Sequence, residues 1–263
     1  AGIDAVWIGA RTMANPFAVQ EIAEAIHGTE LPVMLKNPIN PDLGLWRGGI
    51  ERILQKSKGH ILAIHRGFSM YNSVKYRNIP MWEIPIQLRQ IFPDLKIICD
   101  ASHIAGNHNL ISQVLQTSIN LDFDGYMIEV HPEPENAKSD SEQQLDEASL
   151  EKILSSLHHL NKNSQNPDFQ ANIEALRIDI DRLDSEILAL LASRMDVVRE
   201  IGRYKRDNHV TILQLERWKD ILKNRFGSGN ELQLTDQFIE ELMTCIHKEA
   251  IRQQNKIMNE NGD

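Results

Sequence analysis

The sequence predicts a protein of two parts, an α/β part over residues 1–158 and an all-α part over residues 171–263. In the first part short apolar runs alternate with amphipathic stretches, which is typical of strands followed by helices. The polar segment SSLHHLNKNSQNPDFQ follows, and we interpret residues 159–170 as a linker. Beyond it the apolar residues recur mainly at spacings of three and four, which predicts helices alone.

Five apolar runs predict the strands of the first part. These are Asp4–Gly9, Pro32–Lys36, His60–His65, Lys96–Asp100 and Gly125–Val130. Their starts lie about 30 residues apart, the length of a βα unit. Near-continuous apolar runs suit parallel strands that are covered on both faces. Each run ends in polar residues, and the carboxyl ends of the strands form the active face of a TIM (β/α)₈ barrel. A doubly wound sheet is the alternative.

A closed barrel has eight strands, so the pattern corresponds to its C-terminal five βα units, with the first three missing. The chain opens on Ala1 and enters an apolar run a few residues later. We therefore expect the sequence to start within a domain.

Three helices are predicted in the second part. The longest covers Ile173–Asn208, a shorter one lies near Leu213–Arg225, and Thr235 caps a last helix that ends near Met258. The apolar seam of the long helix consists of Leu176, Ile180, Leu183, Ile187, Leu190, Val198 and Ile201. A helix of that length spans roughly 50 Å, too long for a lone domain of this size to cover. We expect a homodimer that pairs along it.

Charged residues interrupt these seams. Arg194 and Lys205 lie in line with the apolar residues of the long helix, and Arg177 points away from them. On the last helix Phe238, Leu242 and Ile246 set a seam that Glu249 and Gln253 continue. The alternative for any single one of these cations is that its long side chain reaches solvent from the edge of the core and has no binding role. Together they indicate a site for an anionic ligand.

Composition excludes several classes of protein. Hydrophobic residues make up 41% and charged residues 25%, which is ordinary for a globular chain, and the net charge of −9 argues against nucleic acid or an anionic membrane as a partner. No apolar stretch approaches the length of a membrane span. Cys99 and Cys245 lie in apolar runs, so we expect two reduced core residues in a cytoplasmic protein.

The helical part resembles the all-helical chorismate mutase family. The matching stretches are ALRIDIDRLDSEILALLASRMDVVREIGRYK, QLER and HKEAIRQQ. The resemblance implies a cofactor-free rearrangement of chorismate to prephenate by Arg177, Arg194, Lys205, Arg217, Glu249 and Gln253. Arg177 of the partner chain and Arg194 would bind the carboxylates of chorismate. Lys205 and Gln253 would bond its ether oxygen, Arg217 would lie near a carboxylate and Glu249 would take a hydroxyl.

The strand-end motifs resemble the synthase of 3-deoxy-D-arabino-heptulosonate 7-phosphate (DAHP). They are IGARTMAN, PVMLKN, AIHRGFS, IICDASHIAGN and IEVHPEPENAKSD, in family order. The resemblance implies condensation of phosphoenolpyruvate with erythrose 4-phosphate by an enzyme that needs a divalent metal, Mn²⁺ or a similar ion. The implied metal ligands are His103, Glu129 and Asp140, and the implied substrate-binding residues are Arg11, Lys36, Arg66 and Asp100.

Two further parts of the family's site have no counterpart in this sequence. They are a Cys ligand on the first strand and a Lys-Pro-Arg-Thr segment on the second. We therefore expect a bifunctional synthase and mutase in which only the mutase site is complete. The alternatives are a mutase with a non-catalytic barrel-derived scaffold and a module that senses chorismate. His65 and His131 are expected to be hydrogen-bonded loop residues, and Cys99 a core residue.

Overall fold

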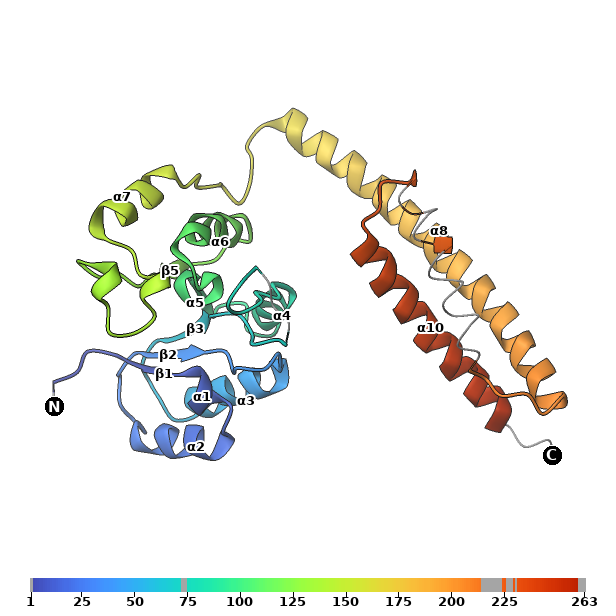
Figure 1. Cartoon of the computed structure of the whole chain (residues 1–263), viewed down its shortest axis with the longest axis horizontal. Coiled ribbons are helices and arrows are strands. Elements are labelled where there is room, and N and C mark those ends of the chain that lie inside the picture. Colours follow the sequence, from blue (N-terminus) through green and yellow to red (C-terminus); the bar gives the residue numbers. More distant parts are fainter. Residues whose placement is uncertain (1, 72–74, 214–223, 226–228, 230, 260–263) are drawn as a thin grey trace. The chain divides into compact units, whose positions relative to one another are not determined.

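The structure is a computed structural model that describes residues 2–71, 75–213, 224–225, 229 and 231–259. The chain divides into two compact units, Ala1–Asn163 and Ser164–Asp263 (Figure 1). We call them the barrel unit and the helical unit. The division falls inside the polar segment that the sequence indicates as a linker.

The barrel unit is built on five parallel strands in the order β1-β2-β3-β4-β5. The strands are β1 (Val6–Ile8), β2 (Val33–Lys36), β3 (Ile61–His65), β4 (Lys96–Asp100) and β5 (Gly125–Met127). All five predicted strands form, although β1 and β5 are shorter than expected. Spatial order follows chain order without the reversal that defines a doubly wound sheet. The sheet therefore has the strand order of a (β/α)₈ barrel.

Helices connect these strands. They are α1 (Ala10–Met13), α2 (Pro16–Ala25), α3 (Leu43–Leu54), α4 (Glu83–Ile91), α5 (Ala101–Ala105), α6 (His108–Asn120) and α7 (Glu147–Ser156), with 3-10 turns at Pro134–Asn136 and Ser141–Gln143. Side-chain caps fix where several of them begin. The Asn15 carboxamide oxygen accepts from two backbone N–H groups of α2, and Asp42, Asp100 and Asp146 cap α3, α5 and α7.

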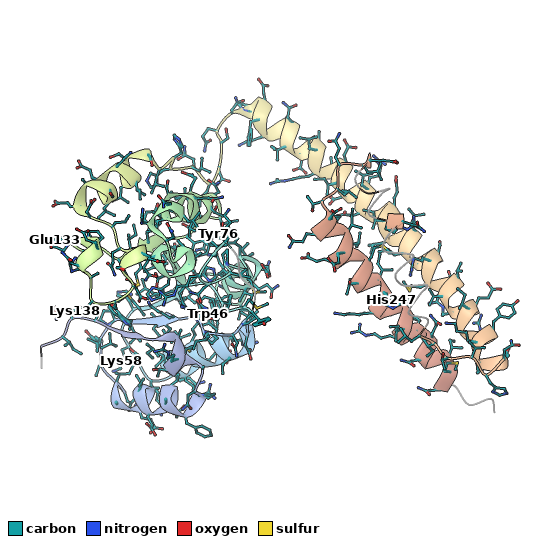
Figure 2. All side chains as sticks on the ribbon, viewed as in Figure 1. Trp46, Lys58, Tyr76, Glu133, Lys138 and His247 are labelled. Carbon is teal, nitrogen blue, oxygen red and sulfur yellow. The ribbon has the colours of Figure 1, made fainter. Side chains whose placement is uncertain are left out.

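The core of the barrel unit lies between the sheet and these helices. Trp46 on α3 is fully buried there, surrounded by the side chains drawn in Figure 2. At Gly49 an added Cβ would meet the Met13 sulfur at 2.3 Å. Glycine at this position therefore allows α1 to pack directly against α3.

The helical unit contains α8 (Pro167–Asp207) and α10 (Asp236–Asn259). Helix α8 begins six residues before the predicted Ile173, because Asn166 accepts from two backbone N–H groups and Pro167 is already suited to a first helical turn. The predicted cap of the last helix is confirmed, since Thr235 Oγ1 accepts from Phe238 N at 3.3 Å. The predicted helix at 213–225 lies largely outside the described residues, as does most of the glycine segment after it.

Helices α8 and α10 lie side by side and run in the same direction (Figure 1). Arg199 contacts Gln253, and three positions further along α8 Gly202 faces Gln254 and Ile257. The face of α10 that is buried carries Ile239, Ala250, Gln254 and Ile257. Phe238 and Leu242 of the predicted α10 seam are 49% and 41% exposed in the single chain, so this face of α10 is not the one that packs against α8.

The predicted seam of α8 is mostly uncovered within one chain. Ile187 is 54% exposed and Leu190 is 71% exposed, whereas Val198 and Gly202 are the α8 residues that are buried in the described part of the chain. Cys99 is buried as predicted, but Cys245 is exposed on α10, so its assignment to a core was wrong. None of the described helices is long and apolar enough to cross a membrane.

Candidate functional site

A cavity of about 560 Å³ opens at the carboxyl ends of the strands in the barrel unit. Its lining residues are Trp7, Gly9, Ala10, Arg11, Lys36, Ile39, Arg66, Ser69, Arg77, Asn78, His103 and Asp140. Four of these are arginines or lysine, so the cavity is strongly cationic. The structure brings together at this cavity the predicted residues Arg11, Lys36, Arg66, His103 and Asp140.

A buried ion pair joins β2 to β4 at this edge of the sheet. Lys36 Nζ lies 2.8 Å from Asp100 Oδ2, and the Asp100 side chain has no exposed surface. Burial acts to raise the pKa of Asp100, but the hydrogen bond and charge of His103 and the charge of Lys36 together hold it below its ordinary value. Asp100 is therefore an ionised carboxylate that fixes both neighbouring side chains.

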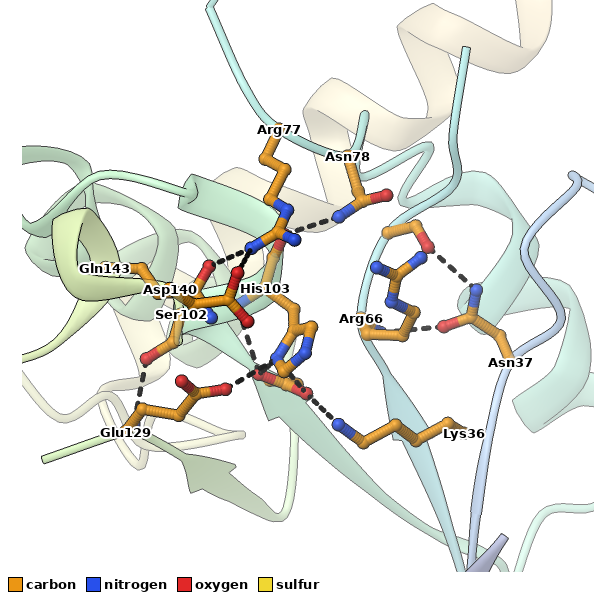
Figure 3. A network of polar contacts seen from close by, with 12 residues as sticks. Lys36, Asn37, Arg66, Arg77, Asn78, Ser102, His103, Glu129, Asp140 and Gln143 are labelled. Atoms are coloured by element: carbon orange, nitrogen blue, oxygen red, sulfur yellow. Dashed lines mark hydrogen bonds and ion pairs between the residues drawn. The ribbon is translucent and has the colours of Figure 1, made fainter. Parts of the chain in front are cut away.

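His103 lies on α5 between two carboxylates (Figure 3). Its Nδ1 is 3.1 Å from Asp100 Oδ1 and 3.1 Å from Glu129 Oε1. Glu129 is held in turn, because its backbone N–H donates to Ser102 Oγ at 2.9 Å and its Oε2 accepts from Gln144 Nε2 at 2.7 Å. Two of the three predicted metal ligands, His103 and Glu129, are thus in contact.

The third predicted ligand, Asp140, has a different partner. Its Oδ1 accepts from Arg77 Nη1 at 2.8 Å, and the same Arg77 nitrogen donates to Gln143 Oε1 at 2.7 Å (Figure 3). In the part of the chain that the structure describes, no three His, Cys, Asp or Glu side chains gather in a way that could hold a metal ion. The described residues therefore supply a contacting pair of donor groups, His103 and Glu129, and a separate carboxylate, Asp140; of these, His103 and Asp140 line the cavity.

The cations at the cavity influence one another. Burial lowers the pKa of Arg66, Asp100 opposes that effect, and the charges of Arg77 and Arg11 lower it further. An anion that binds between arginines across a cavity is favoured, because it reduces their mutual electrostatic repulsion. The arrangement is suited to a phosphate or a carboxylate.

Sequence reasoning missed three polar residues here. Asn37 is fully buried, accepts from Arg66 N at 2.7 Å and donates to Gly67 O at 2.9 Å, so it fixes the backbone that carries Arg66. The position of Asn37 directly after β2 could have indicated that it lies near the cavity. Arg77 and Asn78 lie in the loop between β3 and α4, away from any strand end, where no pattern marked them.

His65 corrects a prediction. It is the last residue of β3 rather than a loop residue, it is fully buried, and rings of Trp46, Phe68, Trp82 and Phe123 surround it at 5.3–6.3 Å between centroids. Neither ring nitrogen has a hydrogen-bond partner among the described residues. Burial lowers the pKa of His65 to about 3, and the nearby Pro80 carbonyl acts in the opposite direction. His131, by contrast, is a loop residue that accepts from Glu133 N at 3.1 Å, as predicted.

In the helical unit Arg194 is partly buried on α8. Its Nη1 atom is enclosed and has no hydrogen-bond partner among the described residues. Burial, followed by the charge of Arg225, lowers the pKa of Arg194. Burial and then the charge of Arg194 also lower the pKa of His247, which Figure 2 labels on α10. An enclosed cation that lacks an anionic partner among the described residues is costly, and an anionic ligand would reduce that cost.

The other predicted residues of this unit are placed differently. Lys205 Nζ donates to Ile212 O at 2.6 Å, and burial lowers its pKa. Gln253 Nε2 donates to Glu249 Oε1 at 2.7 Å. The Arg177 side chain is 71% exposed and lies 3.7 Å from Glu174. Arg217 lies outside the described residues.

A parallel sheet in chain order, with a cationic cavity at the carboxyl ends of its strands, defines the barrel unit as part of a barrel-type enzyme domain. The family model described as "DAHP synthetase I family" matches residues 2–166, well over half of the chain. The chain therefore belongs to the DAHP synthetase I family. A second family model, "Chorismate mutase type II", matches residues 176–255 in the helical unit.

Curated relatives match one unit each. The phospho-2-dehydro-3-deoxyheptonate aldolase of Thermotoga maritima is 29% identical over 143 residues, which is 54% of this chain and 40% of that protein. The bifunctional chorismate mutase/prephenate dehydratase of Buchnera aphidicola is 30% identical over 82 residues, which is 31% of this chain and 21% of that protein. The chain thus spans well under half the length of these relatives.

Solved structures agree with the fold of the barrel unit. A truncated form of DAHP synthase from Thermotoga maritima has a TM-score of 0.51 at 26% identity and covers 58% of this chain and 56% of that one. The crystal structure of phospho-2-dehydro-3-deoxyheptonate aldolase from the same organism has a TM-score of 0.52 at 26% identity and covers 58% and 43%. The predicted fold class, TIM-barrel units followed by a helical mutase domain, is confirmed.

Proposed function

We propose that this protein serves two steps of aromatic amino acid biosynthesis. One is the condensation of phosphoenolpyruvate with erythrose 4-phosphate to DAHP, and the other is the rearrangement of chorismate to prephenate. The match to both families on one chain supports this pairing. The observation that carries the mutase half is the enclosed guanidinium nitrogen of Arg194, which has no hydrogen-bond partner among the described residues.

Chorismate carries two carboxylates, and its rearrangement needs neither a nucleophile nor a proton transfer. A site for this reaction must hold the dianion in a compact shape and stabilise charge that grows on the ether oxygen. In our proposal Arg194 and the partner's copy of Arg177 bind the carboxylates, Lys205 and Gln253 face the ether oxygen, and Glu249 accepts from a hydroxyl. In the same proposal Arg217 lies near a carboxylate, and the family match covers its position in the sequence.

We propose that the helical unit works as a homodimer. The exposed apolar residues of α8, Ile187 and Leu190 among them, support pairing along this helix. Arg177 lies 17 residues before Arg194, which is roughly 25 Å along a helix, so one chain does not bring both to one small ligand. A second copy supplies what the single chain lacks.

In the barrel unit the proposed substrate is phosphoenolpyruvate. Arg11, Lys36 and Arg66 would hold its phosphate and carboxylate, and Asp100 would keep Lys36 oriented. His103, Glu129 and Asp140 are mixed imidazole and carboxylate donors of the kind that Mn²⁺ accepts. Because Asp140 is paired with Arg77, the described donors fit a metal only in part, and we derive no step through one.

We further propose that the 263-residue chain has mutase activity and little synthase activity. Its sheet has five described strands, whereas a closed barrel has eight. A second proposed function, in which the barrel unit acts as a non-catalytic scaffold or regulatory partner of the mutase, is favoured by the pairing of Asp140 with Arg77, which leaves only two of the three proposed donors in contact. Release of phosphate from phosphoenolpyruvate in the presence of erythrose 4-phosphate and Mn²⁺ would contradict both statements.

The test of the mutase half follows the absorbance of chorismate over time. The wild-type chain should consume chorismate, and Arg194→Ala should lower kcat/KM at least a hundredfold because a charge-stabilising donor is lost. Arg182→Ala is the matched control, because Arg182 lies on the same helix and pairs only with exposed acidic side chains in the described contacts. A flat wild-type signal with measurable chorismate binding would instead support a sensor, and an active Arg194→Ala would remove Arg194 from the site.

A further inference from the structure

We propose that Arg199 is a positioning residue for the mutase reaction. In this inference Arg199 fixes the side-chain amide of Gln253 so that the NH₂ group, and not the carbonyl oxygen, is presented to the substrate. The inference rests on the proposed mutase function, in which Gln253 donates to the ether oxygen of chorismate. Arg199 was not among the residues that the sequence indicated.

The Gln253 amide lies between two opposite charges. Arg199 Nη1 on α8 donates to Gln253 Oε1 at 3.3 Å, and Gln253 Nε2 donates to Glu249 Oε1 at 2.7 Å on α10. Each charged neighbour has a further partner, since Arg199 pairs with Asp196 and Glu249 with Arg252. The amide is therefore one member of a row of alternating charges that crosses from α8 to α10.

This row determines the orientation of the amide. The partly negative Oε1 faces a guanidinium, and the partly positive Nε2 faces a carboxylate, so both contacts are attractive and charge-assisted. Rotation of the amide by half a turn would place its N–H groups against Arg199 and its carbonyl oxygen against Glu249. Both contacts would then be repulsive, because Arg199 has only donors and an ionised Glu249 has only acceptors.

The orientation matters for an ether oxygen, which can only accept a hydrogen bond. The NH₂ group of glutamine has two donors, and Glu249 takes one of them among the described residues. The second donor remains for a ligand. In the rotated amide an oxygen would face the ether oxygen, which would destabilise the transition state. Glu249 holds the Nε2 end of the amide from the same helix. Arg199 holds the Oε1 end from the facing helix α8.

The experiment compares Arg199→Lys, Arg199→Ala and Arg199→Glu in the full chain. In Arg199→Ala we expect kcat to fall about tenfold, less than the loss for outright removal of a transition-state donor. KM should stay within about twofold, because the contact acts on charge that develops in the transition state. Arg199→Lys should keep most of the activity, and Arg199→Glu should lose more than Arg199→Ala. The control is Arg203→Ala, an exposed arginine one turn along α8 that should leave kcat unchanged.

A second readout does not depend on turnover. The side-chain NH₂ signals of Gln253 in a ¹⁵N correlation spectrum, assigned with Gln253→Glu, should shift in Arg199→Ala and remain in place in Arg203→Ala. Circular dichroism checks that each variant keeps its helices. Unchanged kcat, a rise in KM alone, or unshifted Gln253 signals in Arg199→Ala would overturn the inference. If the wild-type chain does not consume chorismate, the proposed function fails, and the Gln253 signals still support or overturn the contact with Arg199.

Discussion

The two units of this protein treat buried charge in opposite ways. In the barrel unit Lys36 and Asp100 are almost fully enclosed, and each is the other's partner, with side-chain exposures of 11% and 0%. In the helical unit the enclosed nitrogen of Arg194 has no partner among the described residues. A paired buried charge helps to specify the fold, whereas an unpaired one costs stability until a ligand arrives. The difference separates a cation whose charge is already paired within the chain from one that we propose to be paired by a ligand.

Apolar surface follows the same division. Helices cover the sheet of the barrel unit, so Leu35, Ala63 and Ile97 have almost no exposed surface. In the helical unit Leu188 and Leu190 are 67% and 71% exposed on α8. The barrel unit thus buries these three strand residues with its own helices. The helical unit leaves an apolar face that a second chain can cover.

The largest effect is expected from Asp100→Asn, which keeps the shape of the side chain but leaves Lys36 buried without a counter-charge. We expect the barrel unit to lose about 3–5 kcal/mol of unfolding free energy, measured by urea titration with tryptophan fluorescence. The control is Asp122→Asn, whose carboxylate is half exposed and paired with Arg89 and Lys162. It should change stability by less than about 1 kcal/mol. Equal losses of unfolding free energy in the two variants would contradict the expected difference between a buried and an exposed ion pair.

His65 should make the barrel unit sensitive to acid. Its pKa is lowered from 6.5 to about 3 in the folded protein, so below pH 6.5 the unfolded chain binds a proton that the folded chain does not. Stability from this group is complete above pH 6.5 and falls as the pH drops toward 3. At pH 5 the loss is about 2 kcal/mol relative to pH 7.

The test for His65 compares urea unfolding at pH 7 and pH 5 in the wild type and in His65→Gln, a neutral replacement that cannot take a proton. The absolute stability of the variant is expected to be lower because the aromatic contacts change. The informative quantity is the difference between the two pH values, which should shrink by about 2 kcal/mol. An unchanged difference would show that His65 is already partnered in the folded state.

A smaller effect is expected from Ile187→Asp on α8. The side chain is 54% exposed in the single chain, so the substitution should leave the chain folded but place a charge in the proposed dimer interface. We expect the dimer dissociation constant to rise at least tenfold, about 1.4 kcal/mol, in analytical ultracentrifugation. Arg182→Ala should leave it unchanged. A wild-type chain that sediments as a monomer at micromolar concentration would contradict the dimer.

The sequence was informative where one local pattern determines the structure. Apolar runs predicted all five strands, and polar residues at their ends predicted Lys36 and Arg66 at one cavity, with Asp100 buried beside Lys36. It was not informative where a contact depends on the tertiary structure. Arg77 reaches Asp140 across 63 positions from a loop, and His65 is enclosed by aromatic rings from other elements.

The helical unit shows the same limit. Periodicity predicted α8 and the cap of α10, but it did not determine which face of α10 meets α8. Gly202 presents no side chain, and a Cβ there would lie 3.4 Å from Gln254 and Ile257. Close approach at this glycine selects a face one residue away from the apolar seam that the sequence indicates. The contact of Arg199 with Gln253 could not be predicted from the sequence, because it depends on how α8 packs against α10.

The length of α8 implies that each proposed mutase site is shared between two chains. Arg177 and Arg194 are 17 residues apart on one helix of 41 residues, too far apart to close on one small dianion. Each proposed site then takes one arginine from each chain, and activity belongs to the pair. Chains that carry Arg177→Ala and chains that carry Arg194→Ala should each be inactive alone. After random exchange of subunits about half of the dimers are mixed, and one of the two sites in each mixed dimer contains both arginines. About a quarter of all sites should therefore be active, so two inactive variants should regain turnover when they are mixed.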